Sequence, residues 1–212
     1  MKSRQGILAS GMTLTLIAAI CTALVTATYQ LTAERISANQ RTFLEQSLEP
    51  ALSGVIYDNS VIESKLIIPV PHRLPGSDAA VVYRAYAEDR PAAALFVVTA
   101  RDGYAGPIRL LIGISADGVV TGVRVLEHRE TPGLGDGIDL SRSDWVLQFD
   151  GRSMINPNID GWAIKRDGGQ FDQLTGASVT PRAVIKAISE TLLYFDTHRD
   201  EIFTLPATEE SH

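Results

Sequence analysis

Residues 108–126 have the sequence IRLLIGISADGVVTGVRVL, in which two runs of aliphatic and β-branched residues flank Asp117-Gly118. Asp-Gly between two such runs is a strong signal for a tight β-hairpin turn. Two earlier runs, 80–86 and 92–100, are also rich in β-branched and aromatic residues and are bounded by Gly, Pro and Asp. We therefore expect an antiparallel sheet with strands at 80–86, 92–100, 108–115 and 119–126.

Helical periodicity predicts helices before and after this sheet. Apolar residues fall at mainly helical spacings from 31 to about 52, where Pro50 suits a helix end. Another helix is expected from Pro181 to about Phe195, with Thr180 at its N-cap and one continuous apolar face.

Two weaker patterns predict further elements, a short helix at 142–149 capped by Ser141 and a last strand at 162–165. The expected fold class is α+β, with one N-terminal transmembrane helix followed by a single domain of antiparallel sheet and helices. The predicted parts are a cytoplasmic N-terminus (1–5), a transmembrane helix (6–29), a connecting helix (30–54), an extracytoplasmic domain (55–205) and a flexible tail (206–212).

Composition limits the classes of function. The chain has 212 residues, 45% of them hydrophobic and 21% charged, which is typical of a globular protein of one domain with an appendage. The formal net charge of −6 argues against a nucleic-acid partner, because nucleic-acid-binding proteins carry a basic surface. Cys21 is the only cysteine, which excludes an intrachain disulfide, a four-cysteine iron–sulfur site and a CxxCH haem attachment. Any redox chemistry must use a cofactor that needs no sulfur ligand.

Residues 7–29 form an apolar run, and no charged residue occurs between Arg4 and Glu34. A bilayer core requires roughly 20 such residues in a helix. The alternative is a signal peptide cleaved near 25–27, but the apolar region of a signal peptide has only about 7–15 residues. We therefore expect an uncleaved single-pass anchor. Lys2 and Arg4 predict a cytoplasmic N-terminus, with the domain outside the inner membrane of a bacterial cell.

The segment FDQLTGASVTP, residues 171–181, brings small and hydroxyl-bearing residues directly before the last expected helix. A helix N-terminus has unpaired N–H groups and the positive end of the helix dipole, which together favour an anion. One hypothesis is therefore a phosphate held at Thr180. The alternative is that Thr180 only caps the helix and Gly176 only turns the chain, since Ser and Thr caps are common.

The segment EHRETPGLGDG, residues 127–137, follows the hairpin and contains three glycines and a proline. This composition predicts an irregular loop that lets the backbone approach a ligand closely, with Glu130 and Thr131 supplying an acceptor and a hydroxyl. His128 is expected to be a solvated loop residue, because no second histidine or cysteine lies near it to complete a metal site. We assign no nucleophile, general base or metal ligand. A third turn cluster at 103–107 brings Tyr104 near glycines.

Three motifs in this chain resemble those of one family. GYAGPI at 103–108, EHRETPGLG at 127–135 and DQLTGASVT at 172–180 are similar to the FMN-binding domain of the G subunit of Rnf-type (also called Rsx) electron-transport complexes. The resemblance runs from the membrane anchor through the last helix. The C subunit of the sodium-pumping NADH:quinone reductase is less closely similar and is kept as an alternative.

The resemblance implies an FMN joined to Thr180 by a phosphodiester bond. In this family a flavin transferase that uses FAD and Mg²⁺ installs the flavin and recognises the motif with the acidic residue ahead of it, here Asp172. Thr175 and Ser178 stand where the family usually has Ser and Thr; both keep a hydroxyl, so we expect flavinylation to be retained. The implied cofactor contacts are Thr175, Gly176, Ala177 and Ser178 along the phosphate and ribityl chain, Glu130, Thr131, Leu134 and Gly135 near the isoalloxazine ring, and Tyr104, Trp162 and Lys165 as further neighbours. Trp162 as a core residue is the alternative for that position.

The function implied by the resemblance is electron relay. The complex passes electrons between NADH and ferredoxin or a similar acceptor and couples this to ion movement, so the chain is expected to be one subunit of a redox-driven translocase without a complete reaction of its own. The implied partners are the other membrane subunits, the flavin transferase and membrane lipid. Two alternatives from other classes are an anchored binding or scaffold domain without flavin, and a flavin-bearing sensory domain.

Overall fold

The computed structural model describes residues 2–206, without the side chains of 2–10, Glu34 and Ser37. The contacts between residues divide the chain into two compact units that meet between Phe43 and Leu44. Helix α1 (Lys2–Ala51) contributes to both units as one continuous helix. Its part from Gly11 to Ala51 is long and apolar enough to cross a membrane.

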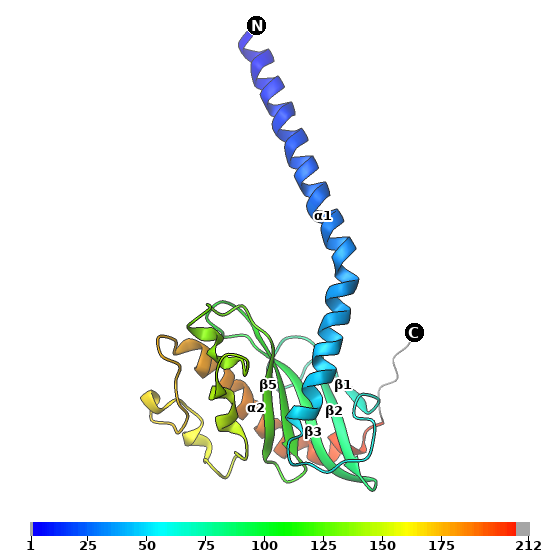
Figure 1. Cartoon of the computed structure of the whole chain (residues 1–212), viewed down its shortest axis with the longest axis vertical. Helices are drawn as coiled ribbons and strands as arrows, with labels where there is room; N and C mark the ends of the chain where they lie inside the picture. Colours follow the sequence, from blue (N-terminus) through cyan, green and yellow to red (C-terminus); the bar gives the residue numbers. More distant parts are fainter. Residues whose placement is uncertain (1, 207–212) are drawn as a thin grey trace. The chain divides into compact units, whose positions relative to one another are not determined.

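An antiparallel sheet forms the centre of the second unit (Figure 1). Within the described residues it has five strands that pair in sequence order: β1 (Lys65–Ile68), β2 (Ala80–Ala87), β3 (Arg90–Ala100), β4 (Ile108–Ser115) and β5 (Val120–Glu127). The strands expected from the sequence are confirmed, and the turn between β4 and β5 falls at the predicted Asp117-Gly118, where Gly118 has a φ of 82°. β1 was not predicted, because four residues ended by Pro69 are too few to display a period of two.

Both faces of the sheet are covered. Phe96 and Ile112 lie in the core on the side of helix α2 (Val179–Thr204). Leu95 and Leu111, their sequence neighbours, point to the other face and pack with Leu48 at the end of α1. Successive strand residues face opposite sides, so a sheet buried on both sides needs apolar residues at consecutive positions. This explains why the strand sequences are almost continuously apolar.

The end of α1 packs on the sheet at a pair of glycines. Gly113 of β4 pairs with Gly122 of β5, and a Cβ added to Gly113 would lie 2.2 Å from the carbonyl oxygen of Ala51. The hydroxyl of Thr121 donates a hydrogen bond of 2.6 Å to the same carbonyl. The missing side chains therefore allow the helix end to approach the strands closely.

Short 3-10 helices occupy the segment between β5 and α2. In the described part of the chain they are η1 (Gly135–Ile138), η2 (Asp144–Phe149), η3 (Ile159–Gly161) and η4 (Lys165–Asp167). The helix expected at 142–149 is thus a 3-10 helix that begins at Asp144. The predicted cap, Ser141, is wrong; Ser143 is the N-cap, and its side-chain oxygen accepts the N–H of Trp145 at 3.2 Å.

The strand expected at 162–165 is also wrong. Trp162 ends η3, and Ile164 forms an isolated parallel bridge with Phe171 before η4 begins. Trp162 is 7% exposed and lies in an aromatic cluster, with ring centroids 6.3 Å from Phe149 and 4.8 Å from Phe171. This single bridge and the packing of the indole therefore hold the segment without a regular strand, and Trp162 is a core residue.

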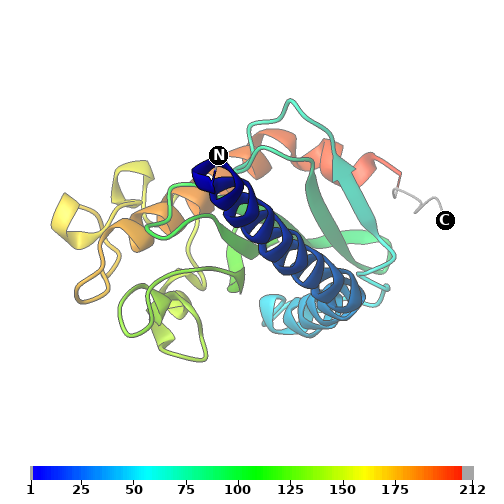
Figure 2. The ribbon, with the colours of Figure 1, turned by 90° about the horizontal axis from the view of Figure 1, so that it is seen from above.

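Helix α2 is confirmed but longer than expected, because its buried face continues past Phe195 to Ile202. Ser178 is its N-cap, so the prediction that Thr180 occupies this position is wrong; Thr180 is the second residue of the helix. Figures 1 and 2 show the 3-10 helices gathered at the end of the domain where α2 begins. The C-terminal half of α2 runs toward the opposite end of the domain. From residue 207 on, the predicted tail lies outside the described residues.

Candidate functional site

A pocket of about 430 Å³ lies at the N-terminal end of α2. Its lining comes from three separate segments: the loop after β3, the loop after β5 and the start of α2. The lining residues are Tyr104, Glu130, Thr131, Leu134, Gly135, Gly176, Ala177, Ser178, Val179 and Thr180. All of them except Val179 were predicted as cofactor contacts from the sequence. The fold therefore brings the three motifs to one place.

The loop before α2 is a tight turn that leaves little side-chain bulk at the pocket. The carbonyl of Leu174 accepts the N–H of Ala177 at 3.2 Å, and Gly176 has a φ of 79°, a conformation that favours glycine. A Cβ added to Gly176 would lie 2.9 Å from Cδ2 of Leu134. Leu134 thus packs directly on the glycine of this turn, which joins the second and third motifs.

The first turn of α2 is suited to an anion. Ser178, the N-cap, makes no side-chain capping hydrogen bond, and Pro181 has no N–H. The first N–H groups of a helix have no partner within the helix, and the helix dipole places partial positive charge there. Ser178, Val179 and Thr180 line the pocket, so the N-terminal end of α2 borders it and is suited to a phosphate.

Thr180 and Glu130 form a buried polar pair at the pocket. Thr180 is 0% and Glu130 4% exposed, and the Thr180 hydroxyl donates a hydrogen bond to Oε2 of Glu130. The other carboxylate oxygen accepts the N–H of Ala105 at 3.1 Å. The alternative in which Thr180 only caps the helix is therefore wrong, because its hydroxyl bonds across 50 residues to Glu130.

Gly135 makes room for this pair. A Cβ added there would lie 2.7 Å from Oε2 of Glu130 and 3.0 Å from Oγ1 of Thr180. The N–H of Gly135 donates to the carbonyl of Thr131 at 3.1 Å, which turns the loop at this point. The glycine is thus required by a close approach, as the loop composition predicted.

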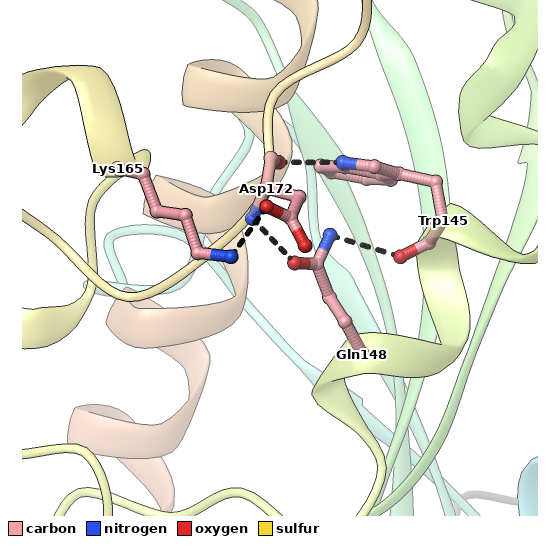
Figure 3. Close-up of polar contacts among 4 residues, drawn as sticks. All are labelled: Trp145, Gln148, Lys165 and Asp172. Carbon is pink, nitrogen blue, oxygen red and sulfur yellow. Dashed lines mark hydrogen bonds and ion pairs between the residues drawn. The ribbon is translucent and has the colours of Figure 1, made fainter.

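Four of the predicted contacts do not line the pocket, and one of them is the core residue Trp162. Thr175 is exposed in the turn. Asp172 and Lys165 form an ion pair with each other at 2.6 Å, and their side chains are 67% and 62% exposed (Figure 3). Their carboxylate and ammonium groups therefore lie on the surface beside the turn.

Two residues that were not predicted hold this part of the chain. The indole N–H of Trp145 donates to the carbonyl of Asp172 at 2.6 Å, and Oε1 of Gln148 accepts the Asp172 N–H at 2.7 Å (Figure 3). The side-chain N–H₂ of Gln148 donates to the carbonyl of Trp145 at 2.9 Å. Helix η2 therefore holds both backbone groups of Asp172. No local pattern could reveal this, since the contacts span 24 and 27 residues.

An ion pair attaches η4 to the start of α2. Nε of Arg182 lies 2.6 Å from Oδ2 of Asp167, and Nη2 lies 2.9 Å from Oδ1. The hydrogen bonds from Arg182 hold the pKa of Asp167 below its ordinary value of 3.8. The same contact raises the pKa of Arg182, so the pair is fully charged at neutral pH.

The pocket at α2 fits a flavin phosphate better than the larger depression on the domain. That depression, about 950 Å³, lies between 68–73 and the C-terminal half of α2, far along the helix from its N-terminus. The α2 pocket has a size typical of small-molecule sites and combines helix N–H groups with apolar side chains. Leu134 is 45% and Val179 41% exposed there, which offers apolar surface to a ring.

Comparison with known proteins agrees with this geometry. Residues 103–193 match the model of the FMN-binding domain family, and residues 1–50 match that of the RnfG N-terminal region. The G subunit of the ion-translocating oxidoreductase complex of Pseudoalteromonas atlantica is 41% identical over 201 residues, which cover 95% of this chain and 94% of that protein. The proteins of the same name from Shewanella loihica (41% over 204 residues, 96% of each chain) and Pseudomonas aeruginosa (42% over 201 residues, 94% of each chain) are similar to the same extent. With its apolar N-terminal helix and an FMN-binding domain behind it, this chain belongs to the family of G subunits of ion-translocating oxidoreductase complexes.

Proposed function

We propose that this chain carries an FMN covalently joined to Thr180 and relays electrons within a membrane-bound, ion-translocating redox complex. The observation that carries the proposal is the convergence of three separate motifs around the Thr180 hydroxyl at the start of α2. When bound, FMN supplies reversible transfer of one or two electrons. The protein's own residues hold, orient and shield it.

Each part of the pocket has a distinct task in this proposal. The N–H groups of the first turn of α2, together with the turn at 175–178, stabilise the negative charge of the phosphodiester. Leu134, Val179 and Tyr104, which are 45%, 41% and 72% exposed, provide the apolar contacts for the ring. Glu130, Thr131 and Gly135 complete the wall. Asp172, which lies outside the pocket and is paired with Lys165, serves recognition by the flavin transferase.

The proposed setting is the inner membrane of a bacterial cell, with a cytoplasmic N-terminus and the FMN-binding domain in the periplasm. Lys2 and Arg4 precede the apolar run and support this orientation. The hydroxyls of Thr15 and Thr22 donate to the carbonyls of Gly11 and Ala18 at 2.9 and 2.8 Å. Helix α1 can therefore carry these threonines in lipid with their donors satisfied. The proposed partners are lipid, the transferase and the other subunits of the complex.

The experiment that tests the attachment compares Thr180→Val with Thr180→Ser in the full chain. Each variant is produced with its flavin transferase and purified in detergent, and its intact mass and its visible spectrum after denaturation are recorded. We expect the wild type and Thr180→Ser to gain the mass of one FMN and to stay yellow. Thr180→Val keeps the shape of the side chain but has no acceptor oxygen, so we expect it to be colourless at unmodified mass.

The stability of Thr180→Val gives a second readout. Glu130 loses a hydrogen bond in a buried site, so we expect a loss of about 1–3 kcal/mol while the domain stays folded. Covalent flavin in a folded Thr180→Val protein would show that the flavin is attached to another residue. A colourless wild type, with the transferase active on another substrate, would favour the scaffold domain without flavin.

Association with the other membrane subunits distinguishes an electron-relay subunit from a redox-sensing domain. A relay subunit must copurify with the multispanning membrane subunits of the complex, and its flavin must be reduced when NADH is added to those membranes. A sensory domain keeps its flavin but needs neither property. Flavin that stays oxidised in membranes that contain the assembled complex would count against the relay.

A further inference from the structure

Glu130 is a buried acid that forms no ion pair with any of the described residues. Its side-chain contacts are the hydroxyl of Thr180 and the N–H of Ala105. Burial of a carboxylate at 4% exposure with two hydrogen bonds and no ion-pair partner is unfavourable for folding. A hydroxyl–carboxylate pair of this kind is also the arrangement by which a base activates an alcohol as a nucleophile.

The surroundings aim the carboxylate at one atom. The N–H of Glu130 donates to Nδ1 of His128 at 3.1 Å, which fixes the backbone where the side chain starts. The N–H of Ala105 holds Oε1, and the missing Cβ of Gly135 lets Oε2 reach the Thr180 hydroxyl. Two chain segments, the loop after β3 and the loop after β5, thus direct one carboxylate oxygen to the hydroxyl at which the flavin is attached in the proposed function.

We propose that Glu130 is the general base for its own chain's flavinylation. As Oγ1 of Thr180 attacks the phosphorus of the FMN half of FAD, the hydroxyl proton passes to Oε2 of Glu130. The new bond is Oγ1–P, the bond that breaks is the P–O bond of the pyrophosphate, and AMP is the leaving group. No oxidation or reduction occurs. This inference rests on the proposed attachment of FMN to Thr180.

The product state supports the same assignment. A phosphodiester on Oγ1 places a negative charge next to the carboxylate that was hydrogen-bonded to this oxygen. Two buried negative charges in contact are strongly unfavourable, so the carboxyl group must be neutral there. The proton taken from Thr180 makes it neutral, and the resulting O–H can donate to the diester. One transfer therefore activates the nucleophile and removes the repulsion in the product.

Access to the hydroxyl requires a small movement. Thr180 is 0% exposed, whereas Leu134, which packs on Gly176 in the same pocket, is 45% exposed. We expect the incoming phosphoryl group to reach Oγ1 by displacing Leu134, with the Glu130 contact kept until the proton moves. If Glu130 only held Thr180 in its buried position, the hydrogen bond between them would instead have to break before the hydroxyl could react.

The test is the rate of FMN incorporation into full-length protein in detergent, with purified transferase, FAD and Mg²⁺, followed by intact mass. Glu130→Gln keeps the size of the side chain but cannot take a proton, and we expect the rate to fall by about 10²–10⁴-fold. Because hydroxide can replace the missing base, the rate of this variant should rise with pH more steeply than that of the wild type. Glu127→Gln, an exposed glutamate in the same segment, is the matched control and should react at the wild-type rate.

The outcomes distinguish the roles open to Glu130. Incorporation into Glu130→Gln at the wild-type rate would overturn the proposal and mean that the transferase supplies the base. Faster incorporation would also overturn it and mean that Glu130 only holds Thr180 in its buried position. Modification of the wild type at another residue, or none, would instead contradict the attachment itself. If Glu130→Gln melts below the assay temperature, Glu130→Asp replaces it. The shorter carboxylate of Glu130→Asp should slow the reaction by about 10²-fold and leave its dependence on pH as in the wild type. A rate that rises with pH more steeply than the wild-type rate would mean that this carboxylate does not act as the base, and would overturn the proposal.

Discussion

At the scale of single residues, the site depends on two glycines whose missing side chains leave room for their neighbours. Gly135 lies against both members of the Glu130–Thr180 pair, and Gly176 lies under Leu134. Any side chain at either position would enter space that is already filled. Gly135 is therefore explained by close packing around the Thr180 hydroxyl, and Gly176 by its turn and by its contact with Leu134.

Gly135→Ala tests this explanation. The added methyl group must displace Glu130 or Thr180, so we expect a loss of about 1–3 kcal/mol in stability and slower FMN incorporation. Thermal unfolding by circular dichroism and intact mass after flavinylation measure the two effects. Gly137→Ala is the control, since its Cβ would meet the flexible end of Leu174 at 3.0 Å. Equal melting temperature and equal incorporation in Gly135→Ala and the wild type would refute the close-packing account.

At the scale of secondary-structure elements, α2 runs from the candidate site to the opposite end of the domain. There a buried arginine binds the last carbonyls of the helix. Arg84 of β2 is 3% exposed. Its Nη1 donates to the carbonyls of Ile202, at 3.1 Å, and Leu205, and its Nε donates to the carbonyl of Ser64 at 3.3 Å. The last carbonyls of a helix carry partial negative charge, so a buried cation is well placed there.

Arg84→Met tests the importance of this cap. The substitution fills similar space but leaves buried carbonyls at the end of α2 without their donor, and we expect a loss of about 2–4 kcal/mol. Hydrogen exchange should increase at the last turn of α2 more than at its first turn. Arg90→Met, at an exposed position, is the control. A change below about 0.5 kcal/mol, the range of ordinary surface substitutions, would show that water replaces the guanidinium without cost.

At the scale of the whole molecule, ion pairs join loops of the domain to α2 around its surface. Arg182 pairs with Asp167, and Lys186 pairs with Asp102 at 2.7 Å. Hydrogen bonds from the basic partners hold the pKa of both aspartates below the ordinary value of 3.8. A carboxylate whose native pKa is lowered stabilises the fold fully above the unfolded value and ceases to do so as the pH falls through the native one. These pairs therefore contribute to stability at neutral pH and lose that contribution in acid.

Asp167→Asn removes one such contribution. We expect the wild type to melt at a higher temperature than the variant at pH 6, and the difference to shrink as the pH falls from about 4 toward 2. Both side chains are partly exposed, so high salt should reduce the difference at pH 6. Thermal unfolding of the two proteins over this pH range measures the effect. A difference that stays constant with pH would mean that the charge of Asp167 is unimportant for stability.

The elements with local signals were predictable from sequence. Runs of β-branched and aromatic residues bounded by turn residues located four strands and the Asp117-Gly118 hairpin, because strand and turn preferences act within a few residues. The resemblance of three short motifs to one family pointed to the segments that line the pocket, although Thr175, Asp172 and Lys165 lie outside its lining. Errors occurred where packing overrides local preference, as for Trp162, which joins an aromatic cluster where a strand was expected.

The sequence by itself determined the apolar N-terminal helix and four of the strands, and its motifs marked the three segments that line the pocket. Only the tertiary structure decided that Thr180 meets Glu130 across 50 residues, that η2 holds Asp172, and that Arg84 ends α2. The physical reason is the range of the interactions. Local preferences depend on neighbours in the chain, whereas a buried hydrogen bond depends on which distant segments the packed core brings within about 3 Å.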